Sequence, residues 1–209
     1  MMPDFSHEQE LIKTYGPLCA GVDEVGYGAW AGPVLVCAAI LDLEKIDNDL
    51  LLQLNDSKKI TKKQREKIFD LLIASDGVKF KIEQSDPDDI DEHNVLCATH
   101  HAMIKAAISL SPDSILLDGV NKPDFSVPCK TLIDGDQKSY SIAAASILAK
   151  VSRDRIMEKF HNDHPHYGWD TNVGYGTKKH QDGLEKHGVT NHHRKSYKPI
   201  ALLLERGHS

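Results

Sequence analysis

The chain has 209 residues, of which 40% are hydrophobic and 27% charged, and its formal net charge is −6. This length predicts one domain with at most a small appendage, and the composition excludes fibrous, collagen-like and wholly disordered proteins. The best apolar run, at 33–41, is far shorter than the roughly 18 residues of a membrane helix. The acidic N-terminus lacks the apolar stretch of a signal peptide. We therefore expect a cytoplasmic protein that does not bind membranes.

Charge and cysteines are distributed unevenly. From Lys150 onwards the chain has 11 basic and 7 acidic residues and eight of its 12 histidines, whereas the rest carries a net charge of −10. A basic tail on an acidic body is consistent with a phosphate-binding surface beside a metal-binding one, and an unevenly charged solvated surface is the alternative. The four cysteines form no Cys-x-x-Cys motif, so we expect reduced, structural thiols.

Hydrophobic periodicity and turn residues divide the chain into strands and helices. The run at 34–41 is apolar throughout, as in a strand covered on both faces. Thr61 and Gln64 form a capping box ahead of apolar residues at helical spacing. In chain order we expect strands at 18–23 and 34–41, a helix at 62–75, a strand at 78–82, a helix at 90–110, strands at 114–117 and 130–133, a helix at 142–160, a loop at 161–177 and a helix at 178–187 that ends at Gly188.

This order of elements predicts an α/β fold, with helices on the faces of a mixed sheet. The segment after Phe160 carries basic charge and short elements. We therefore expect a core at 1–160 and a small C-terminal loop and helical segment at 161–209.

Three of the expected strands end in acids, namely Asp23 with Glu24, Asp118, and Asp136. Ligands of open α/β sheets bind beyond the strand ends. Carboxylates that meet there repel one another unless cations neutralise them, and hard oxygen ligands suit Mg²⁺ or Mn²⁺. Two such ions could activate water and stabilise the leaving oxygen in phosphodiester hydrolysis. Asp-Gly after an apolar run is also typical of an ordinary turn, and the sequence does not show that these strands are neighbours.

Several blocks of sequence, in order from about residue 18 to 200, resemble the type 2 ribonucleases H (the ribonuclease HII family). Each block alone is weak, whereas their combination is specific. The blocks are AGVDEVG and AGP within 20–33, NDSKK at 55–59, LDG at 117–119, GD at 135–136, SIAAASILAK at 141–150 with Val151, Arg153 and Asp154, and YG, GYGT and HR within 167–194.

The resemblance implies an RNase H-like fold, a mixed sheet flanked by helices, in which the segment at 161–209 contributes to substrate binding. It implies a monomeric endoribonuclease that hydrolyses the RNA strand of RNA/DNA hybrids. The same enzyme would cut 5′ of ribonucleotides embedded in duplex DNA, as in ribonucleotide excision repair, leaving 3′-hydroxyl and 5′-phosphate ends.

The resemblance also implies two Mg²⁺ or Mn²⁺ ions, with the four acids as catalytic residues and metal ligands. By analogy Asp23 would bridge both ions, Glu24 and Asp118 would hold the ion at the leaving group, and Asp136 would hold the ion that activates water.

The residues that the resemblance assigns to the substrate are Gly26, Tyr27, Gly28, Lys58 and Tyr175. Glycine lets the backbone approach a ligand closely, and the 2′-hydroxyl distinguishes RNA from DNA. The family has Gly-Arg-Gly where this chain has Gly-Tyr-Gly, so a charged phosphate contact is lost. Ala29 and Trp30 are also unusual there. Altered recognition of RNA–DNA junctions is therefore an alternative. Tyr175 matches a tyrosine that stacks on a sugar; packing within a glycine-rich loop is its alternative.

Other residues carry weaker hypotheses. We considered zinc at His161, His164 and His166 and favour duplex contact or loop structure, and we single out His193 without assigning it a role. A catalytically weak nucleic-acid-binding relative and a different RNase H-like metallonuclease are the alternative functions; the four acids disfavour the first and SIAAASILAK the second. Candidate phosphate contacts are Lys58, Lys150, Arg153, Lys178, Lys179, Arg194 and Lys195, of which Lys150 and Arg153 could instead support the acidic site structurally.

Overall fold

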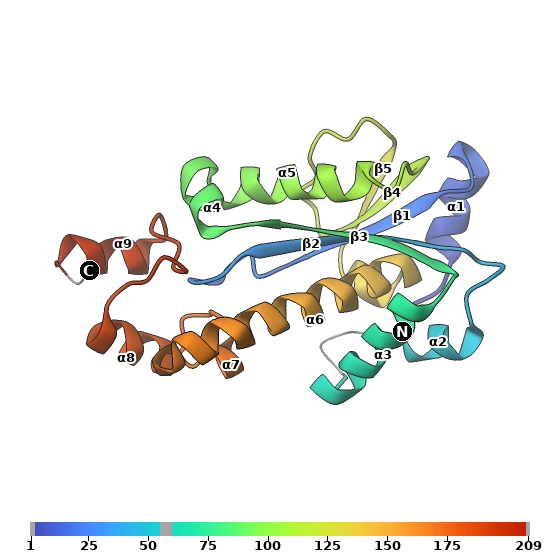
Figure 1. The fold of residues 1–209 in the computed structure, drawn as a ribbon. Helices are drawn as coiled ribbons and strands as arrows, with labels where there is room; N and C mark the ends of the chain where they lie inside the picture. Colours follow the sequence, from blue (N-terminus) through green and yellow to red (C-terminus); the bar gives the residue numbers. More distant parts are fainter. Residues whose placement is uncertain (1–2, 55–59, 208–209) are drawn as a thin grey trace. The chain divides into compact units, whose positions relative to one another are not determined.

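A computed structural model describes residues 3–54 and 60–207, and its strands form one sheet in the order β3-β2-β1-β4-β5 (Figure 1). The elements are α1 (Ser6–Tyr15), β1 (Cys19–Val25), β2 (Val34–Leu41), α2 (Asn48–Gln53), α3 (Lys62–Ala74), β3 (Val78–Ser85), α4 (Pro87–His93), α5 (Val95–Ile108), β4 (Ser114–Asp118), β5 (Cys129–Leu132), α6 (Tyr140–Asp163), α7 (Trp169–Asn172), α8 (Lys178–His187) and α9 (Lys198–Glu205), with 3-10 turns at Gly135–Gln137 and Pro165–Tyr167.

Strands β1, β4 and β5 run parallel as neighbours. Val22 of β1 lies opposite Leu117 of β4, and Leu117 lies opposite Thr131 of β5. Parallel strands present their carboxyl ends at the same edge of a sheet. The sheet order therefore brings the ends of the three acid-bearing segments to one edge, which the sequence alone does not establish.

The chain forms two compact units, and the first comprises the described residues of Met1–Val25, Val36–Glu83 and His100–Val151. In this unit α5 contributes Ala102 and Ala106 to an apolar cluster with Val22. Helices α2, α3 and α6 contribute to a second cluster around Ala39 (Figure 1). Every residue of β2 is buried. The prediction of a strand covered on both faces is therefore confirmed.

The second unit comprises Gly26–Leu35, Gln84–Thr99 and the described residues of Ser152–Ser209. Its apolar core is built from α6, α7, α8 and α9, which contribute Met157, Trp169, Leu184 and Ile200. Ala31, from the segment that follows β1, belongs to the same cluster. The C-terminal segment thus folds together with two segments that come much earlier in the sequence.

The expectation of one helix at 90–110 is wrong. Asn94 has φ +63° and separates α4 from α5. Asparagine tolerates this left-handed region better than most residues, and its side chain competes for local backbone groups. Here Asn94 Oδ1 accepts a hydrogen bond from the N–H of Cys97 at 3.1 Å, which satisfies a donor in the first turn of α5.

Some helices were not expected from the sequence. The loop at 161–177 contains α7 and a 3-10 turn, and α6 extends to Asp163. Helices α1, α2 and α9 were also not predicted. The six-residue α2 is capped by Asp47, whose carboxylate accepts a hydrogen bond from the N–H of Asp49 at 2.9 Å. Helices this short depend on caps and tertiary packing more than on periodicity.

Candidate functional site

Four carboxylates come from the shared edge of the first unit. Asp23 and Glu24 lie near the carboxyl end of β1, Asp118 is the last residue of β4, and Asp136 lies in the 3-10 turn after β5. Asp23 and Asp136 are buried, with exposed fractions of 8% and 3%. All four are residues that the sequence analysis selected.

The pKa of Asp23 responds to the charges of the other three carboxylates. Burial raises the pKa of the Asp23 carboxyl well above its usual value, and the negative charges of Glu24, Asp118 and Asp136 raise that pKa further. A hydrogen bond with Ser146, on α6, acts in the opposite direction. The ionised form of Asp23 is therefore unfavourable without a positive charge nearby.

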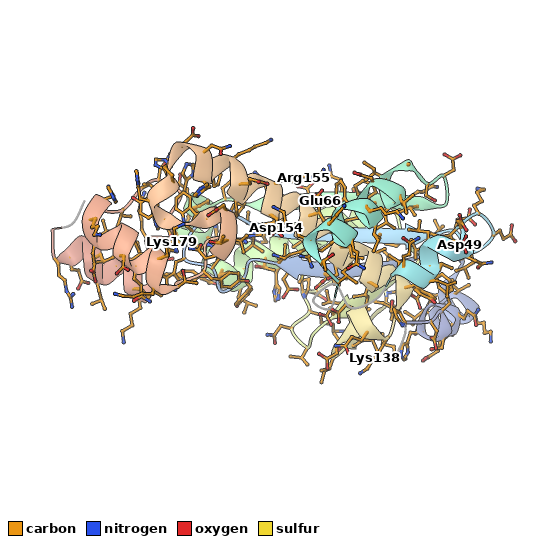
Figure 2. All side chains as sticks on the ribbon, turned by 90° about the horizontal axis from the view of Figure 1, so that it is seen from below. Asp49, Glu66, Lys138, Asp154, Arg155 and Lys179 are labelled. Atoms are coloured by element: carbon orange, nitrogen blue, oxygen red, sulfur yellow. The ribbon has the colours of Figure 1, made fainter. Side chains whose placement is uncertain are left out.

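Local backbone contacts fix the segment that carries Asp136. Asp118 Oδ1 accepts a hydrogen bond from the N–H of Gly135 at 2.6 Å, and a Cβ at Gly135 would lie 2.7 Å from Ile142 Cδ1. Lys138, labelled in Figure 2, donates to the carbonyl oxygen of Ile133 at 2.7 Å. The absence of a side chain at Gly135 helps the turn after β5 approach Asp118 closely, because a Cβ there would lie 3.1 Å from Asp118 Oδ1.

Helix α1 fixes the other end of the same segment through Glu8, which is 3% exposed. Its Oε1 accepts hydrogen bonds from Ser139 Oγ at 2.6 Å, Ser141 N at 3.0 Å and Ser141 Oγ at 2.8 Å. A carboxylate at the start of α6 satisfies N–H groups that lack helical partners and interacts favourably with the helix dipole. Glu8 carried no recognisable signal in the sequence, whereas Ser146 lies within the SIAAASILAK block.

The four carboxylates suit a hard divalent cation in charge and ligand type, because they offer only oxygen atoms. In the described residues, no three His, Cys, Asp or Glu side chains are already arranged to hold one ion. A bound cation would therefore have to draw the carboxylates inward. Burial of Asp23 and its repulsion by the three other carboxylates, which together raise its pKa, are consistent with such binding.

In the second unit, Arg194 holds the Gly-Tyr-Gly turn. Its guanidinium donates to the carbonyl oxygens of Gly26 and Tyr27, each at 2.7 Å, and to that of Gly32 at 3.0 Å. The C=O and N–H of a trans peptide point in opposite directions. The N–H groups of Tyr27 and Gly28 belong to the same two peptide units as these carbonyls, and they therefore point away from Arg194. Gly28, at this end of the turn, is exposed.

Arg153 is fully buried and holds the segment that follows the Gly-Tyr-Gly turn. It donates to the carbonyl oxygens of Pro33 at 2.9 Å, Val173 at 2.8 Å and Ala31 at 3.2 Å. Burial lowers the pKa of Arg153 to about 10, so it stays charged at neutral pH. Neither Arg153 nor Arg194 has exposed surface, and the hypothesis that they contact phosphate directly is wrong because backbone carbonyls occupy their donors.

A side chain should be poorly tolerated at Gly26. It has φ +89°, and a Cβ there would lie 2.1 Å from Arg153 Nε; Gly119 has φ +86° and nothing within 4 Å of its Cβ position. We expect Gly119→Ala to cost about 1 kcal/mol of unfolding free energy from backbone strain alone, and Gly26→Ala to cost roughly 1–3 kcal/mol more from overpacking. Urea denaturation of the two variants measures this, and equal losses would contradict it.

Tyr175 lies beside the turn within the second unit. Its side chain is 41% exposed, and its Cε1 atom lies 3.9 Å from the position of a Cβ on Gly28. Arg153 lies 6.0 Å from the ring centroid. The structure thus brings Gly26, Tyr27, Gly28 and Tyr175 into one neighbourhood, whereas Lys58 lies outside the described residues.

Of the remaining basic candidates, Lys178, Lys179 and Lys195 are exposed, whereas Lys150 on α6 is half-buried. Lys179 of α8, labelled in Figure 2, has a side chain 58% exposed and lies 4.0 Å from Asp170. Lys178 pairs with Asp182 at 2.7 Å, and Lys195 lies 3.9 Å from Asp88. Exposed pairs of this kind are weak, so these lysines are compatible with phosphate contact.

The three histidines considered for zinc have other contacts. His161 Nδ1 lies 3.3 Å from Asp170, and His164 packs edge-on against Trp169. His166 stacks on His187 with ring centroids 3.9 Å apart. The structure thus shows which protein groups these three rings contact, and duplex contact stays a prediction for them.

Comparison with solved structures defines the class of fold. The ribonuclease H2 of Pyrococcus horikoshii OT3 is 26% identical and superposes with a TM-score of 0.77, over 91% of this chain and 98% of that one. Bst-RNase HIII, solved in complex with Mn²⁺, is 17% identical with a TM-score of 0.70, over 94% of this chain and 72% of that one. The expected α/β, RNase H-like fold is therefore confirmed.

Sequence comparison gives the family. Residues 20–200 match the family model for ribonuclease HII. The ribonuclease HII of Ehrlichia canis (strain Jake) is 43% identical over 204 residues, covering 95% of this chain and 96% of the relative. The chain belongs to the ribonuclease HII family and is an endoribonuclease. Membership of this family supports activity on RNA/DNA hybrids.

Proposed function

We propose that this endoribonuclease hydrolyses the RNA strand of RNA/DNA hybrids and cuts 5′ of ribonucleotides embedded in duplex DNA, leaving 3′-hydroxyl and 5′-phosphate ends. The acidic cluster of Asp23, Glu24, Asp118 and Asp136 would perform the chemistry. The observation that carries this proposal is the parallel order β1-β4-β5, which brings the acid-bearing strand ends to one edge of the sheet. The raised pKa of Asp23, caused by burial and by the three other carboxylates, supports it.

In this proposal the four acids would hold two Mg²⁺ or Mn²⁺ ions, which would supply an activated water and stabilise the leaving oxygen. Asp23 would contribute to both ion positions, Glu24 and Asp118 to the position near the leaving group, and Asp136 to the position near the attacking water. Glu8 and Gly135 hold the segment that carries Asp136, and Ser146 orients Asp23.

The substrate would be recognised by backbone groups of Gly26, Tyr27 and Gly28, with the ring of Tyr175 beside them and Lys58 as a further contact. The outward direction of the amide hydrogens in this turn supports recognition without an arginine at position 27, because Arg194 orients the peptide units. The segment at 161–209 would add exposed lysines that contact phosphates.

A cleavage assay on two substrates tests this proposal. The substrates are a uniform RNA/DNA hybrid and a DNA duplex that contains one ribonucleotide, each with Mg²⁺, with Mn²⁺ and with a chelator. We expect the wild type to cut both substrates and to lose activity with the chelator. Cleavage of the hybrid but not of the single ribonucleotide, at any salt concentration, would favour the alternative of altered junction recognition. Metal-independent cleavage, or no cleavage of either substrate, would contradict the proposal.

Tyr27→Arg tests how the turn holds phosphate. An added guanidinium should introduce about one more phosphate contact, which steepens the dependence of log affinity on log salt by about 0.9 and lowers KM at low salt. The expected change is in KM, with kcat close to wild type, because the four acids are untouched. Tyr27→Phe is the matched control, which keeps the ring and adds no charge. An unchanged salt dependence in Tyr27→Arg would show that position 27 does not face the phosphate chain.

We further propose a monomeric protein of the cytoplasm that acts in ribonucleotide excision repair. The four cysteines are free thiols, as is typical of a reducing compartment. In the described part of the chain, no helix has the length and apolar character needed to cross a bilayer.

A further inference from the structure

Two buried histidines of the second unit have no part in the function proposed above. His180, on α8, and His193, in the loop before α9, have no exposed surface, and their Nε2 atoms lie 3.0 Å apart. The ring of Trp169 packs against both. Two buried groups that can each carry a positive charge are costly unless they stay neutral and hydrogen-bonded.

The contacts fix which nitrogen of each ring carries the proton. Trp169 Nε1–H can only donate, and it lies 3.2 Å from His180 Nε2, so this nitrogen is an acceptor. The main-chain N–H of Thr190 lies 3.0 Å from His193 Nδ1, so this nitrogen is also an acceptor. The remaining proton of each neutral ring is therefore on His180 Nδ1 and on His193 Nε2.

These two assignments define one ordered chain of hydrogen bonds. His193 Nε2–H donates to His180 Nε2 at 3.0 Å and shares the single lone pair of this nitrogen with the more distant Trp169 donor, and His180 Nδ1–H donates to the carbonyl oxygen of Tyr175 at 3.0 Å. Burial lowers the pKa of both histidines, that of His193 to about 3, so each ring is neutral at pH 7. The Tyr175 carbonyl also accepts from the N–H of Thr177, two residues on. The bond from His180 adds to the bonds that the N–H groups of Trp30 and Ala31 donate to the Gly174 carbonyl, and it holds the loop to the buried part of the unit at Tyr175 itself.

We propose that His180 and His193 form a proton-ordered pair that fixes the main chain at Tyr175 and thereby holds its ring beside Gly28 for contact with the nucleic acid. This inference rests on the substrate role proposed for Tyr175. The two histidines are positioning residues, because they act through Tyr175 and do not touch the reacting atoms. The Gly-Tyr-Gly turn and Tyr175 then form one recognition surface whose geometry is set by a neutral pair beneath it.

Variants of His180 test the proposal through KM. Stacking of a tyrosine on a nucleotide contributes enough that its loss raises KM about tenfold. We expect His180→Phe, which keeps a ring against Trp169 but donates no hydrogen bond, to raise KM for the duplex with one ribonucleotide by about five- to tenfold with kcat within about twofold. His180→Asn, which retains a donor near the position of Nδ1, should recover most of this loss. His192→Phe is the matched control, because His192 stacks on Phe160 with centroids 3.9 Å apart. Among the described residues no hydrogen bond joins its ring to the Tyr175 loop, so its KM should stay at the wild-type value.

A double-mutant cycle with Tyr175→Ala separates this inference from the proposed function. If the pair acts through Tyr175, His180→Phe should add little to the KM of Tyr175→Ala. Additive effects, or a KM for His180→Phe equal to wild type while Tyr175→Ala raises it, would overturn the positioning role and leave the substrate role of Tyr175 intact. An unchanged KM for Tyr175→Ala would instead overturn the substrate role and the function of the pair together.

A measurement on the wild-type protein needs no variant to fold. Nitrogen-15 NMR of the imidazole rings at pH 7 should show protonated Nδ1 for His180 and protonated Nε2 for His193, with neither ring charged. Opposite tautomers, or a charged ring at either position, would overturn the proposal.

Discussion

Asp23→Asn is expected to lower the cleavage rate at least ~10³-fold with Mg²⁺ or Mn²⁺, because removing one carboxylate from a shared ion site removes several kcal/mol of transition-state stabilisation. The variant should remain folded, since asparagine matches the shape of the side chain and the neighbouring repulsion is reduced. Single-turnover cleavage of an RNA/DNA hybrid measures the effect. Asp182→Asn is the control, because Asp182 pairs with Lys178 on exposed α8 and should leave the rate unchanged. Activity of Asp23→Asn within about tenfold of wild type would contradict the role given to Asp23.

The same variant should change how stability depends on pH. The pKa of Asp23 is higher in the folded protein than in the unfolded chain, so the folded state retains this proton as the unfolded state loses it. The metal-free wild type should therefore lose stability as the pH rises above the ordinary Asp pKa of about 4. Asp23→Asn removes this contribution and should unfold at a higher temperature than the wild type in alkaline, metal-free buffer. Excess Mg²⁺ should reverse the order, because it binds the ionised carboxylates of the wild type.

Glu8→Ala is expected to destabilise the protein by about 2–4 kcal/mol. The change leaves the buried hydroxyls of Ser139 and Ser141 and the N–H of Ser141 without their shared acceptor, and it removes a helix cap. For a chain of this length the melting temperature should fall by roughly 4–16 °C. Glu8→Gln retains one carbonyl oxygen and should lose less.

Glu10→Ala is the matched control for Glu8→Ala. Glu10 lies on the same helix, is exposed and pairs with Lys130 at 2.6 Å at the surface. It should change the melting temperature little, because exposed ion pairs contribute little. A melting temperature of Glu8→Ala equal to that of Glu10→Ala would contradict the anchoring role of α1.

Local signals in the sequence predicted most elements of the fold. The capping box at Thr61 and Gln64 forms as expected at the start of α3, and the unbroken apolar run of β2 is buried along its whole length. The break at Asn94 was missed because apolar residues recur at helical spacing on both sides of it, and periodicity does not report one residue with a positive φ. Periodicity does not predict helix α1, because its buried Glu8 accepts hydrogen bonds from residues about 130 positions away. A contact between such distant residues leaves no local pattern in the sequence.

The sequence selects candidate residues for the site but does not show that they lie close together. Acidic residues at strand ends, together with the family resemblance, select Asp23, Asp118 and Asp136. Their position at one edge of the sheet depends on the strand order β1-β4-β5, which is a non-local property of the fold. For Arg153 and Arg194 the sequence suggests a role that the structure does not support. Basic side chains near a glycine-rich turn suggest phosphate contacts, whereas their burial and carbonyl partners become visible only once distant segments are folded together.

The two buried arginines also leave an electrical imbalance in the second unit. In the part of the chain that the structure describes, the acceptors that hydrogen-bond to Arg153 and Arg194 are uncharged oxygens of carbonyls and of the Tyr197 hydroxyl. Hydrogen bonds of this kind satisfy the donors but do not cancel two full positive charges, and the carboxylates of Asp154 and Asp91 act on Arg153 and Arg194 only through space. A low-dielectric interior screens such charges poorly, so part of their field reaches the Gly-Tyr-Gly turn. Attraction of a polyanion to this turn should therefore persist after every exposed lysine nearby has been neutralised.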